Sequence, residues 1–222
     1  MIKLALWNNK KMNSNICYNL LHYHTEGYDS KGRFNSYWHQ IDEIRKRNPK
    51  RILEVGIGSG FLNHYLKSLN LNITTLDIEL NLKPDVIGSV LALPLKSNSF
   101  EMVVCFQVLE HLPFESFPAC LKELSRVSKR WVVISLPDAT RGVSLFIRST
   151  GRVSWTKILI IPHFIRKKHT FNGEHYWEIG KKGFPLRFIR KIIENTGLKF
   201  IKTYRVPEFM IHRFFVLEND VK

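Results

Sequence analysis

The chain has 222 residues, of which 44% are hydrophobic and 12% aromatic, which is enough to bury the core of a single domain. Its formal net charge of +15 indicates a negatively charged partner or surface, because solubility alone seldom needs so large an excess. The three cysteines have no metal-binding spacing, and no apolar run is long enough for a signal peptide or a membrane span. We therefore expect one soluble, cytoplasmic domain over residues 1–222, in a reducing compartment and without a metal site.

The first 48 residues are expected to form an extension of loop and helix. Residues 1–34 show no steady periodicity, and the alternating His22 and His24 are expected to be surface residues rather than metal ligands. From Asn35 to Arg47 the apolar residues have helical spacing, which predicts a helix that ends before Asn48-Pro49. Its expected apolar face consists of Tyr37, Trp38, Ile41 and Ile44.

A short apolar run that leads into alternating glycines is the most informative stretch. Ile52 to Gly56 predicts a short buried strand, and residues from Phe61 onward have helical spacing. Glycines between them permit positive φ and let a ligand approach the backbone, as in strands that bind nucleotides at their carboxyl ends. The third glycine of the dinucleotide fingerprint is replaced by Phe61, and there is no P-loop lysine. A nucleotide-like ligand other than NAD is indicated.

With its preceding acid, the run Glu54-x-Gly56-x-Gly58-x-Gly60 resembles motif I of the class I S-adenosylmethionine (SAM)-dependent methyltransferases. The resemblance implies that this acid and the glycines hold the methionine end of the cofactor. The alternative is an ordinary glycine-rich turn of an α/β domain.

A second acid follows the next predicted strand, from Ile73 to Asp77. A carboxylate at the end of such a strand can accept hydrogen bonds from both ribose hydroxyls, although an Asp there can also cap a helix. Asp77 followed by Ile78 resembles motif II of the same class. This implies that Asp77 holds the ribose and that Ile78 lies against the adenine.

Residues 85–106 predict a short third strand, a loop and a buried fourth strand from Met102 to Phe106. The run resembles the pattern before the fourth strand in the ubiquinone and menaquinone type of methyltransferase (methyltransferase type 11). The resemblance places Ser89 and Val90 at the adenine. Ser89 stands where that family usually has an acid, and a hydroxyl is the weaker acceptor, which lowers the expected cofactor affinity.

The segment after the fourth strand, from Gln107 to Pro113, resembles the V-L-E-H segment of that family and faces the cofactor in it. Glu110 beside His111 can serve as a base or orient one, and the alternative is a helix-start acid with a packed histidine. His175 is a further candidate, because the family often has a histidine at the mouth of the site. The Asn/Asp-Pro-Pro-aromatic run of enzymes that methylate nucleic-acid bases is absent, which disfavours that activity.

The remaining pattern alternates between helix and strand and predicts a parallel sheet with right-handed crossovers. Two closing strands with only a short connection, from Arg205 to Ile211, must be antiparallel. The fold class expected is therefore α/β and Rossmann-like, with the family's seven-stranded order 3-2-1-4-5-7-6. The helices are predicted at 118–129 and 186–196, and the strands at 131–136, 198–204 and 212–217.

An insertion at residues 139–173 has no counterpart in the common pattern. It contains seven basic residues and no acid, together with many apolar side chains. We expect this basic flap to cover the acceptor side of the site, with possible contact to a membrane or an anionic molecule. The alternative is a solvated flap that packs its apolar side chains on the core.

These features predict a SAM-dependent methyltransferase that acts on a small-molecule or a lipid- or glycan-linked acceptor, expected to be anionic. The alternatives are an RNA methyltransferase, favoured by the charge, and a catalytically silent SAM-binding partner subunit, favoured by Ser89. The expected catalytic residues are Glu110, His111 and His175, and the expected cofactor-binding residues are Glu54, Gly56, Gly58, Gly60, Asp77, Ile78, Ser89, Val90 and Gln107.

Overall fold

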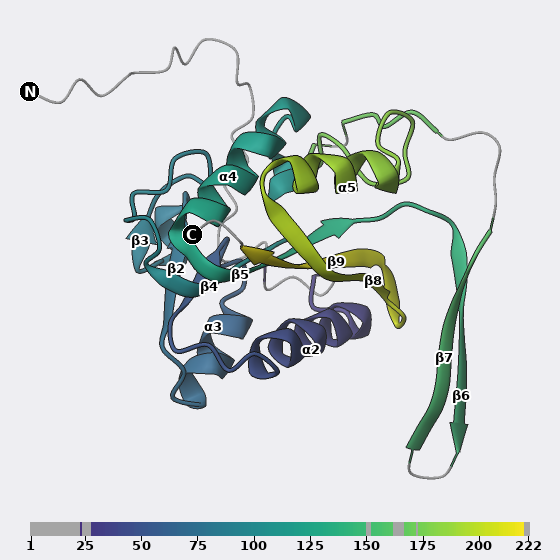
Figure 1. The fold of residues 1–222 in the computed structure, drawn as a ribbon. Helices are drawn as coiled ribbons and strands as arrows, with labels where there is room; N and C mark the ends of the chain where they lie inside the picture. Colours follow the sequence, from purple (N-terminus) through teal and green to yellow (C-terminus); the bar gives the residue numbers. More distant parts are fainter. Residues whose placement is uncertain (1–22, 24–27, 150–151, 162–166, 172, 220–222) are drawn as a thin grey trace, which may run out of the picture.

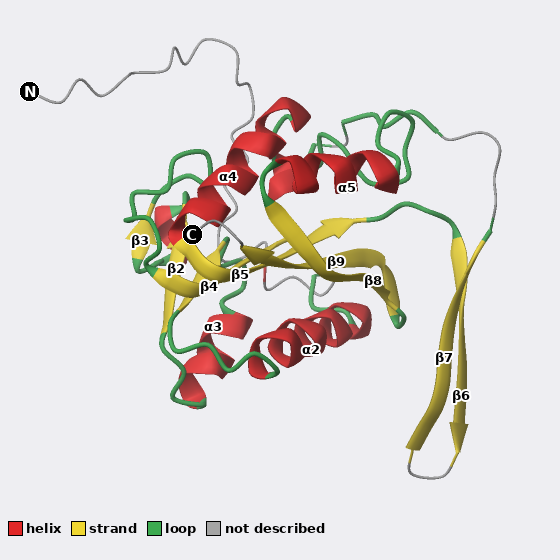
Figure 2. Cartoon of the chain, in the orientation of Figure 1, coloured by secondary structure: helices red, strands yellow, loops and turns green. Residues whose placement is uncertain are grey.

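The computed structural model describes residues 23, 28–149, 152–161, 167–171 and 173–219. Its body is a sheet between two layers of helices (Figures 1 and 2). Helices α2 (Lys31–Arg45) and α3 (Phe61–Ser68) cover one face, and α4 (Phe117–Val127) and α5 (Leu186–Asn195) cover the other. No helix among the described residues is long and apolar enough to cross a membrane.

The sheet has seven strands in the order β3-β2-β1-β4-β5-β9-β8. All neighbours are parallel except β9, which is antiparallel to both β5 and β8. Since β6 and β7 form a separate hairpin, β8 and β9 are the sixth and seventh strands of the sheet, and the predicted order 3-2-1-4-5-7-6 is confirmed. The strands are β1 (Ile52–Val55), β2 (Ile73–Asp77), β3 (Val86–Ile87), β4 (Phe100–Phe106), β5 (Ser128–Pro137), β8 (Leu198–Val206) and β9 (Phe209–Asn219).

The core is divided between the two faces of the sheet by the alternation of strand side chains. In β1, Leu53 and Val55 belong to the cluster that packs against α4 and α5, whereas Ile52 belongs to the one that packs against α2 and α3. All of these side chains are buried. Because the period is two, Glu54 must share the face of Ile52, and the sheet therefore points this acid toward α2 and α3.

Helix α2 begins earlier than predicted, at Lys31 rather than Asn35. Ser30 caps it, because its hydroxyl accepts a hydrogen bond from the Arg33 amide at 3.3 Å. The predicted apolar face was wrong at Trp38, which is 59% exposed, whereas Tyr37 is 8% exposed. Consecutive helical residues point about 100° apart, so only one of this pair can face the sheet.

Residues 139–173 include an antiparallel hairpin of β6 (Gly142–Ser149) and β7 (Arg152–Ile160). It leaves the carboxyl end of β5 and stands away from the body of the molecule (Figure 1). One contact with the body is made by Ser144, whose hydroxyl donates to the Pro207 carbonyl at 2.6 Å. That carbonyl lies in the turn between β8 and β9, which is tighter than the predicted connection because β9 already begins at Phe209.

Candidate functional site

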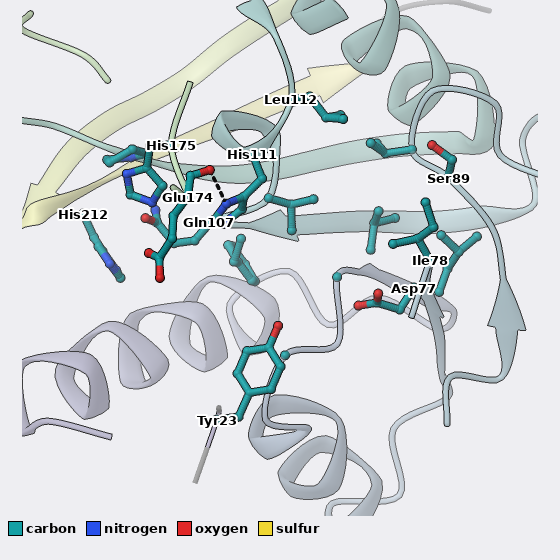
Figure 3. Close-up of a pocket in the computed structure, with 18 of the residues that line it drawn as sticks. Tyr23, Asp77, Ile78, Ser89, Gln107, His111, Leu112, Glu174, His175 and His212 are labelled. Atoms are coloured by element: carbon teal, nitrogen blue, oxygen red, sulfur yellow. Dashed lines mark hydrogen bonds between the residues drawn. The ribbon is translucent and has the colours of Figure 1, made fainter. Parts of the chain in front are cut away.

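A cavity of about 380 Å³ lies at the carboxyl ends of the parallel strands, where open α/β sheets bind their ligands. A smaller cavity of about 50 Å³ shares part of this wall and continues toward α2 and α3. The main cavity is lined by Tyr23, Tyr28, Arg33, Val55, Gly56, Gly58, Leu76, Asp77, Ile78, Gly88, Ser89, Val90, Phe106, Gln107, Val108, His111, Leu112, Pro137, Glu174, His175, Ile211 and His212. Figure 3 shows most of them.

The glycine loop after β1 forms the boundary between the two cavities. Gly56 and Gly58 line both of them and have φ values of 86° and 51°, which side chains rarely tolerate. A Cβ at Gly56 would overlap the Val108 side chain, so this position also requires glycine for space. Gly60, expected among the cofactor-binding residues, lines neither cavity and instead begins α3 in a left-handed conformation.

Glu54 lines the smaller cavity and is buried. Its Oε2 atom has no hydrogen-bond partner among the described residues. Burial, and then the neighbouring charge of Asp77, raise the pKa of this carboxyl well above its usual value. A buried carboxylate without a partner is costly, and a cationic ligand in the adjoining cavity would compensate it.

Asp77 lies on the wall of the main cavity (Figure 3). Its Oδ2 accepts from the Ile57 amide and its Oδ1 from the Glu79 amide, both at 2.9 Å. Since an ionised carboxylate has about four lone-pair sites, Asp77 keeps acceptor capacity for a ligand hydroxyl. Burial raises the pKa of Asp77. Ile78 is 74% exposed and lies at the rim of this wall.

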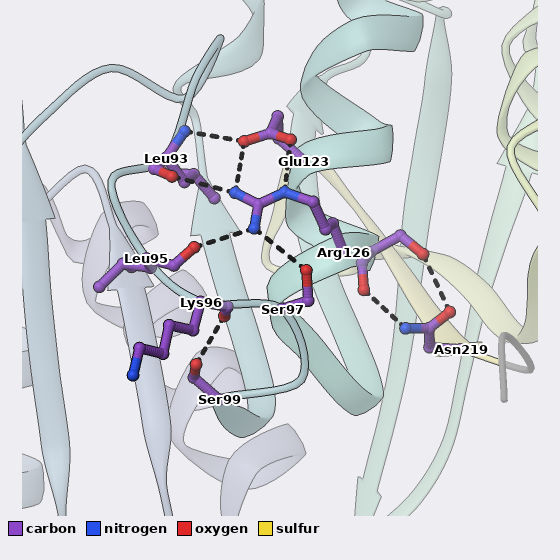
Figure 4. Close-up of polar contacts among 9 residues, drawn as sticks. Leu93, Leu95, Lys96, Ser97, Ser99, Glu123, Arg126 and Asn219 are labelled. Carbon is purple, nitrogen blue, oxygen red and sulfur yellow. Dashed lines mark hydrogen bonds and ion pairs between the residues drawn. The ribbon is translucent and has the colours of Figure 1, made fainter. Parts of the chain in front are cut away.

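Ser89 and Val90 complete this wall from the loop after β3. The loop is held against α4 by Arg126, which donates to the carbonyls of Leu93 and Leu95 at 3.0 and 2.9 Å and pairs with Glu123 (Figure 4). Glu123 in turn accepts from the Leu93 amide at 2.8 Å. These bonds fix the conformation of the loop that positions Ser89.

Glu110, His111 and His175 come together although His111 and His175 are 64 positions apart in the chain. One carboxylate oxygen and one ring nitrogen from each histidine all lie within 4.8 Å of one another. His111 and His175 line the main cavity, whereas Glu110 is fully buried behind them. Burial raises the pKa of Glu110 to about 7. The expected catalytic residues are therefore neighbours, but Glu110 does not reach the cavity itself.

Gln107 connects this cluster to β5. It has a left-handed backbone with φ of 54°, and its side chain lines both cavities. In one of the two orientations of its side-chain amide, both the oxygen and the nitrogen have suitable hydrogen-bond partners. In this orientation its oxygen accepts from the Ser135 hydroxyl at 3.0 Å and the Leu136 amide at 3.1 Å, and its nitrogen donates to Glu110 Oε1 at 3.2 Å.

Several residues of the cavity were not predicted from the sequence. Arg33 lines both cavities; its Nε donates to the Tyr28 carbonyl at 2.8 Å, and its guanidinium lies 3.8 Å from the centre of the Tyr28 ring. His212 lines both cavities as well, and its Nδ1 bonds to the Ser36 hydroxyl at 2.8 Å. The only local signal in the sequence for these residues was Ser30. A serine three residues before Arg33 is typical of the start of a helix, and it indicates that Arg33 lies in the first turn.

No described residue of 139–173 lines either cavity, and the expectation that this segment covers the acceptor side stays a prediction. Glu174 and His175, which follow it, line the main cavity. The hairpin stands away because its two strands pair with each other rather than with the sheet. The predictions for His22 and His24, and for the basic residue Arg166, lie outside the described residues.

Comparisons with known proteins agree with this architecture. A family model described as a methyltransferase domain matches residues 53–134. An uncharacterised protein of Methanocaldococcus jannaschii is 34% identical over 89 residues, which are 37% of this chain and 38% of that protein, so the match spans less than half of either length.

Solved structures are similar over most of the chain. The magnesium protoporphyrin IX methyltransferase of Synechocystis, with bound S-adenosylhomocysteine, has a TM-score of 0.57 at 15% identity and covers 85% of this chain and 84% of its own. The 1,6-didemethyltoxoflavin-N1-methyltransferase of Burkholderia thailandensis has a TM-score of 0.58 at 12% identity, with coverage of 86% and 79%. A SAM-dependent methyltransferase of Clostridium acetobutylicum also gives 0.58, at 10% identity, with coverage of 89% and 96%. The segment of residues 53–134 is therefore similar to a methyltransferase domain, and the chain shares the fold of these SAM-dependent methyltransferases.

Proposed function

We propose that this protein binds SAM and transfers its methyl group to a small-molecule acceptor. The observation that carries the proposal is Glu54, a buried carboxylate with an unpartnered oxygen that lines the small cavity beside the glycine loop. The methionine end of SAM has an ammonium and a carboxylate. Glu54 would pair with the ammonium, and Arg33, which lines the same cavity, would pair with the carboxylate.

The adenosine end would extend into the main cavity. Asp77 would accept hydrogen bonds from the ribose hydroxyls, and Ile78, Ser89 and Val90 would contact the base. Gln107 would contact the cofactor from the end of β4, where it lines both cavities. When bound, SAM supplies a methyl group that is already activated by the sulfonium, so positioning of the acceptor provides much of the rate.

The remaining wall of the main cavity would hold the acceptor. It combines His111, His175 and His212 with the apolar Pro137 and Ile211, which suits a flat or partly apolar molecule with a polar reacting atom. His111 and His175 would orient that atom, held by the Glu174 carbonyl and the Glu178 carboxylate. Two of the similar structures are named as methyltransferases of small molecules, a porphyrin and a toxoflavin precursor, which supports this acceptor class.

Calorimetry with purified protein tests the cofactor. We expect binding of SAM and S-adenosylhomocysteine but not of NAD, because Phe61 occupies the position of the third dinucleotide glycine and stacks on Tyr37, with ring centres 4.7 Å apart. Asp77→Ala should weaken SAM binding by about 2–4 kcal/mol, since it removes charge-assisted hydrogen bonds to the ribose. Glu79→Gln is the matched control, because Glu79 adjoins Asp77 but does not line the cavity. Binding of NAD without SAM, or an unchanged SAM affinity in folded Asp77→Ala, would contradict the assignment.

We further propose that the β6–β7 hairpin contacts an anionic surface, which would bring the cavity close to a lipid-linked acceptor. Support comes from exposed basic side chains, Lys157 on β7 and Arg141, Lys167 and Lys168 in the segments that flank the hairpin, together with exposed apolar side chains of the hairpin. An RNA methyltransferase would show RNA binding that falls steeply as salt rises. A catalytically silent subunit would bind SAM but form no S-adenosylhomocysteine with any acceptor.

A further inference from the structure

We propose that Glu110, His111 and His175 bind a divalent transition-metal ion at the wall of the main cavity. One potential ligand atom from each residue lies within 4.8 Å of the other two. Ligands of one ion with bonds of about 2.0–2.2 Å lie about 3–3.5 Å apart, so small side-chain rotations would close the site. No metal was expected from the sequence, because its three cysteines have no metal-binding spacing.

The histidines are oriented as metal ligands usually are. His111 Nδ1 lies 3.0 Å from the Glu174 carbonyl oxygen, and His175 Nδ1 lies 3.0 Å from Glu178 Oε1. Both partners are acceptors, and in the neutral tautomer that donates to them from Nδ1, the Nε2 atom carries the lone pair that binds a metal. A backbone carbonyl and a carboxylate are the two common outer partners of metal-binding histidines.

The Glu110 carboxylate also has the environment expected of a metal ligand. Glu110 is 0% exposed, and its Oε2 has no hydrogen-bond partner among the described residues. Its Oε1 can accept from the Gln107 amide at 3.2 Å, which would fix the plane of the carboxylate. A buried carboxylate oxygen beside two imidazoles is a site that a cation would stabilise.

The donor set selects the type of ion. Two imidazoles and one carboxylate suit Zn²⁺, Co²⁺, Mn²⁺ or Fe²⁺ better than Mg²⁺ or Ca²⁺, which prefer oxygen ligands. Since three protein ligands leave coordination positions open, and since His111 and His175 line the cavity, the open positions would face the acceptor.

The role of the ion rests on the proposed function. A hydroxyl or phenol of the acceptor could coordinate at an open position, where its pKa would fall. Its proton would then leave to water near neutral pH, and the oxygen that keeps the electron pair would form the new bond to the methyl carbon as the bond from carbon to sulfur breaks. The inference therefore assigns an oxygen acceptor.

Metal binding is tested without SAM or acceptor. The metal-stripped full chain is titrated with Zn²⁺ or Co²⁺ alone in a calorimeter, and the visible absorption of bound Co²⁺ is recorded. We expect one equivalent to bind, with much weaker binding of Mg²⁺. Glu110→Gln, His111→Ala and His175→Ala should each weaken Zn²⁺ binding by more than about 100-fold and abolish the Co²⁺ spectrum. Gln107→Ala should weaken it by about 10–100-fold, as expected for an outer partner of a ligand.

His64→Gln is the matched control, because it removes a histidine on α3 that lines neither cavity, and it should leave the affinity unchanged. Thermal unfolding of each variant distinguishes loss of the metal site from loss of the fold. If an alanine variant does not fold, Glu110→Gln, which conserves the shape of the side chain, is used to test the metal site. Absence of binding to the parent chain, or equal binding by the parent and folded Glu110→Gln, would overturn the metal site. If a chelator changes neither the binding nor the turnover of SAM, the metal inference fails while the proposed function stands. If the chain binds the metal but not SAM, the metal site stands and the proposed function fails.

Discussion

At the scale of single residues, the site depends on polar side chains that are buried with few partners. Glu54 and Glu110 each keep one oxygen without a hydrogen-bond partner among the described residues. Such groups cost stability unless a ligand compensates them, which is typical of sites built to bind charged ligands. Their burial follows from the sheet, because Glu54 occupies the inner position of a central strand and Glu110 the turn directly after its neighbour.

His212 gives a prediction for the pH dependence of stability. Burial, and then the charges of Arg33 and His175, lower the pKa of His212 to about 3 from the usual 6.5. Between pH 6.5 and 3 the unfolded chain binds a proton at this residue that the folded chain does not, so the free energy of unfolding falls as the pH falls. The loss is about 1.4 kcal/mol per pH unit. His212→Asn, which can keep a hydrogen bond to Ser36, should therefore reduce this slope between about pH 6 and 4.

Urea unfolding at a series of pH values measures the slope for the parent and the variant. The comparison uses the slope and not the absolute stability, because the substitution also changes packing. If the stability of His212→Asn falls with decreasing pH as steeply as that of the parent, His212 does not remain neutral in the fold.

At the scale of elements, a buried ion cluster joins the end of β5 to the β8–β9 pair. Asp138 accepts from Arg213 Nε at 2.7 Å, and Arg205 Nε lies 3.7 Å from the same carboxylate oxygen. All three side chains are buried. Arg205 also donates to the Met210 carbonyl at 2.6 Å, and Asp138 accepts from the Thr140 amide at 2.9 Å. The cluster therefore fixes the point at which the chain leaves the sheet for the hairpin.

Asp138→Ala should lower the free energy of unfolding by about 3–5 kcal/mol, because it leaves two guanidinium groups buried without their carboxylate. Glu218→Ala is the matched control on β9. Its partner Arg130 is 62% exposed, and such surface pairs contribute only about 0–1 kcal/mol. Denaturant unfolding compares the two variants, and equal losses would show that the Asp138 cluster does not stabilise the fold.

At the scale of the whole molecule, the β6–β7 hairpin is the feature that a compact α/β body does not explain. A two-stranded hairpin is marginal in water, and this one exposes apolar side chains on both strands. They are Val143, Leu145, Phe146 and Ile147 on β6, with Leu159, Ile160 and the following Ile161 on the other side. Exposed apolar patches of this kind mark surfaces that bind a partner or a membrane.

We expect the protein to sediment with anionic liposomes and far less with neutral ones, because each basic residue near an anionic surface contributes about 1 kcal/mol. Replacing Lys157, Lys167 and Lys168 with Gln should weaken this sedimentation and leave SAM affinity unchanged, since none of them lines the cavities. Replacing Lys46, Lys50 and Lys122 with Gln changes the net charge equally but outside residues 139–173. Equal loss in both triple variants would show that the overall charge, and not the basic segment 139–173, causes the sedimentation.

The sequence by itself determined the central strands, the fold class and the conformation of the glycine loop after β1. The strand Ile73–Asp77 has the predicted ends, and β1 ends at Val55, one residue before the predicted end, because a buried parallel strand must be apolar and the glycines and acids that follow it are local signals. The glycines of the loop could be recognised for the same reason, since positive φ and close approach are requirements of single positions.

Only the tertiary structure decided which distant residues share the cavity. Arg33 enters it from the first turn of α2, His212 from an antiparallel strand and His175 from the loop before α5. None of these positions follows from local periodicity, because they depend on how loops at one edge of the sheet converge. The same holds for the hairpin, whose composition indicated a surface element. Its direction away from the cavity, however, depends on the pairing of β6 with β7 and on the buried cluster at Asp138.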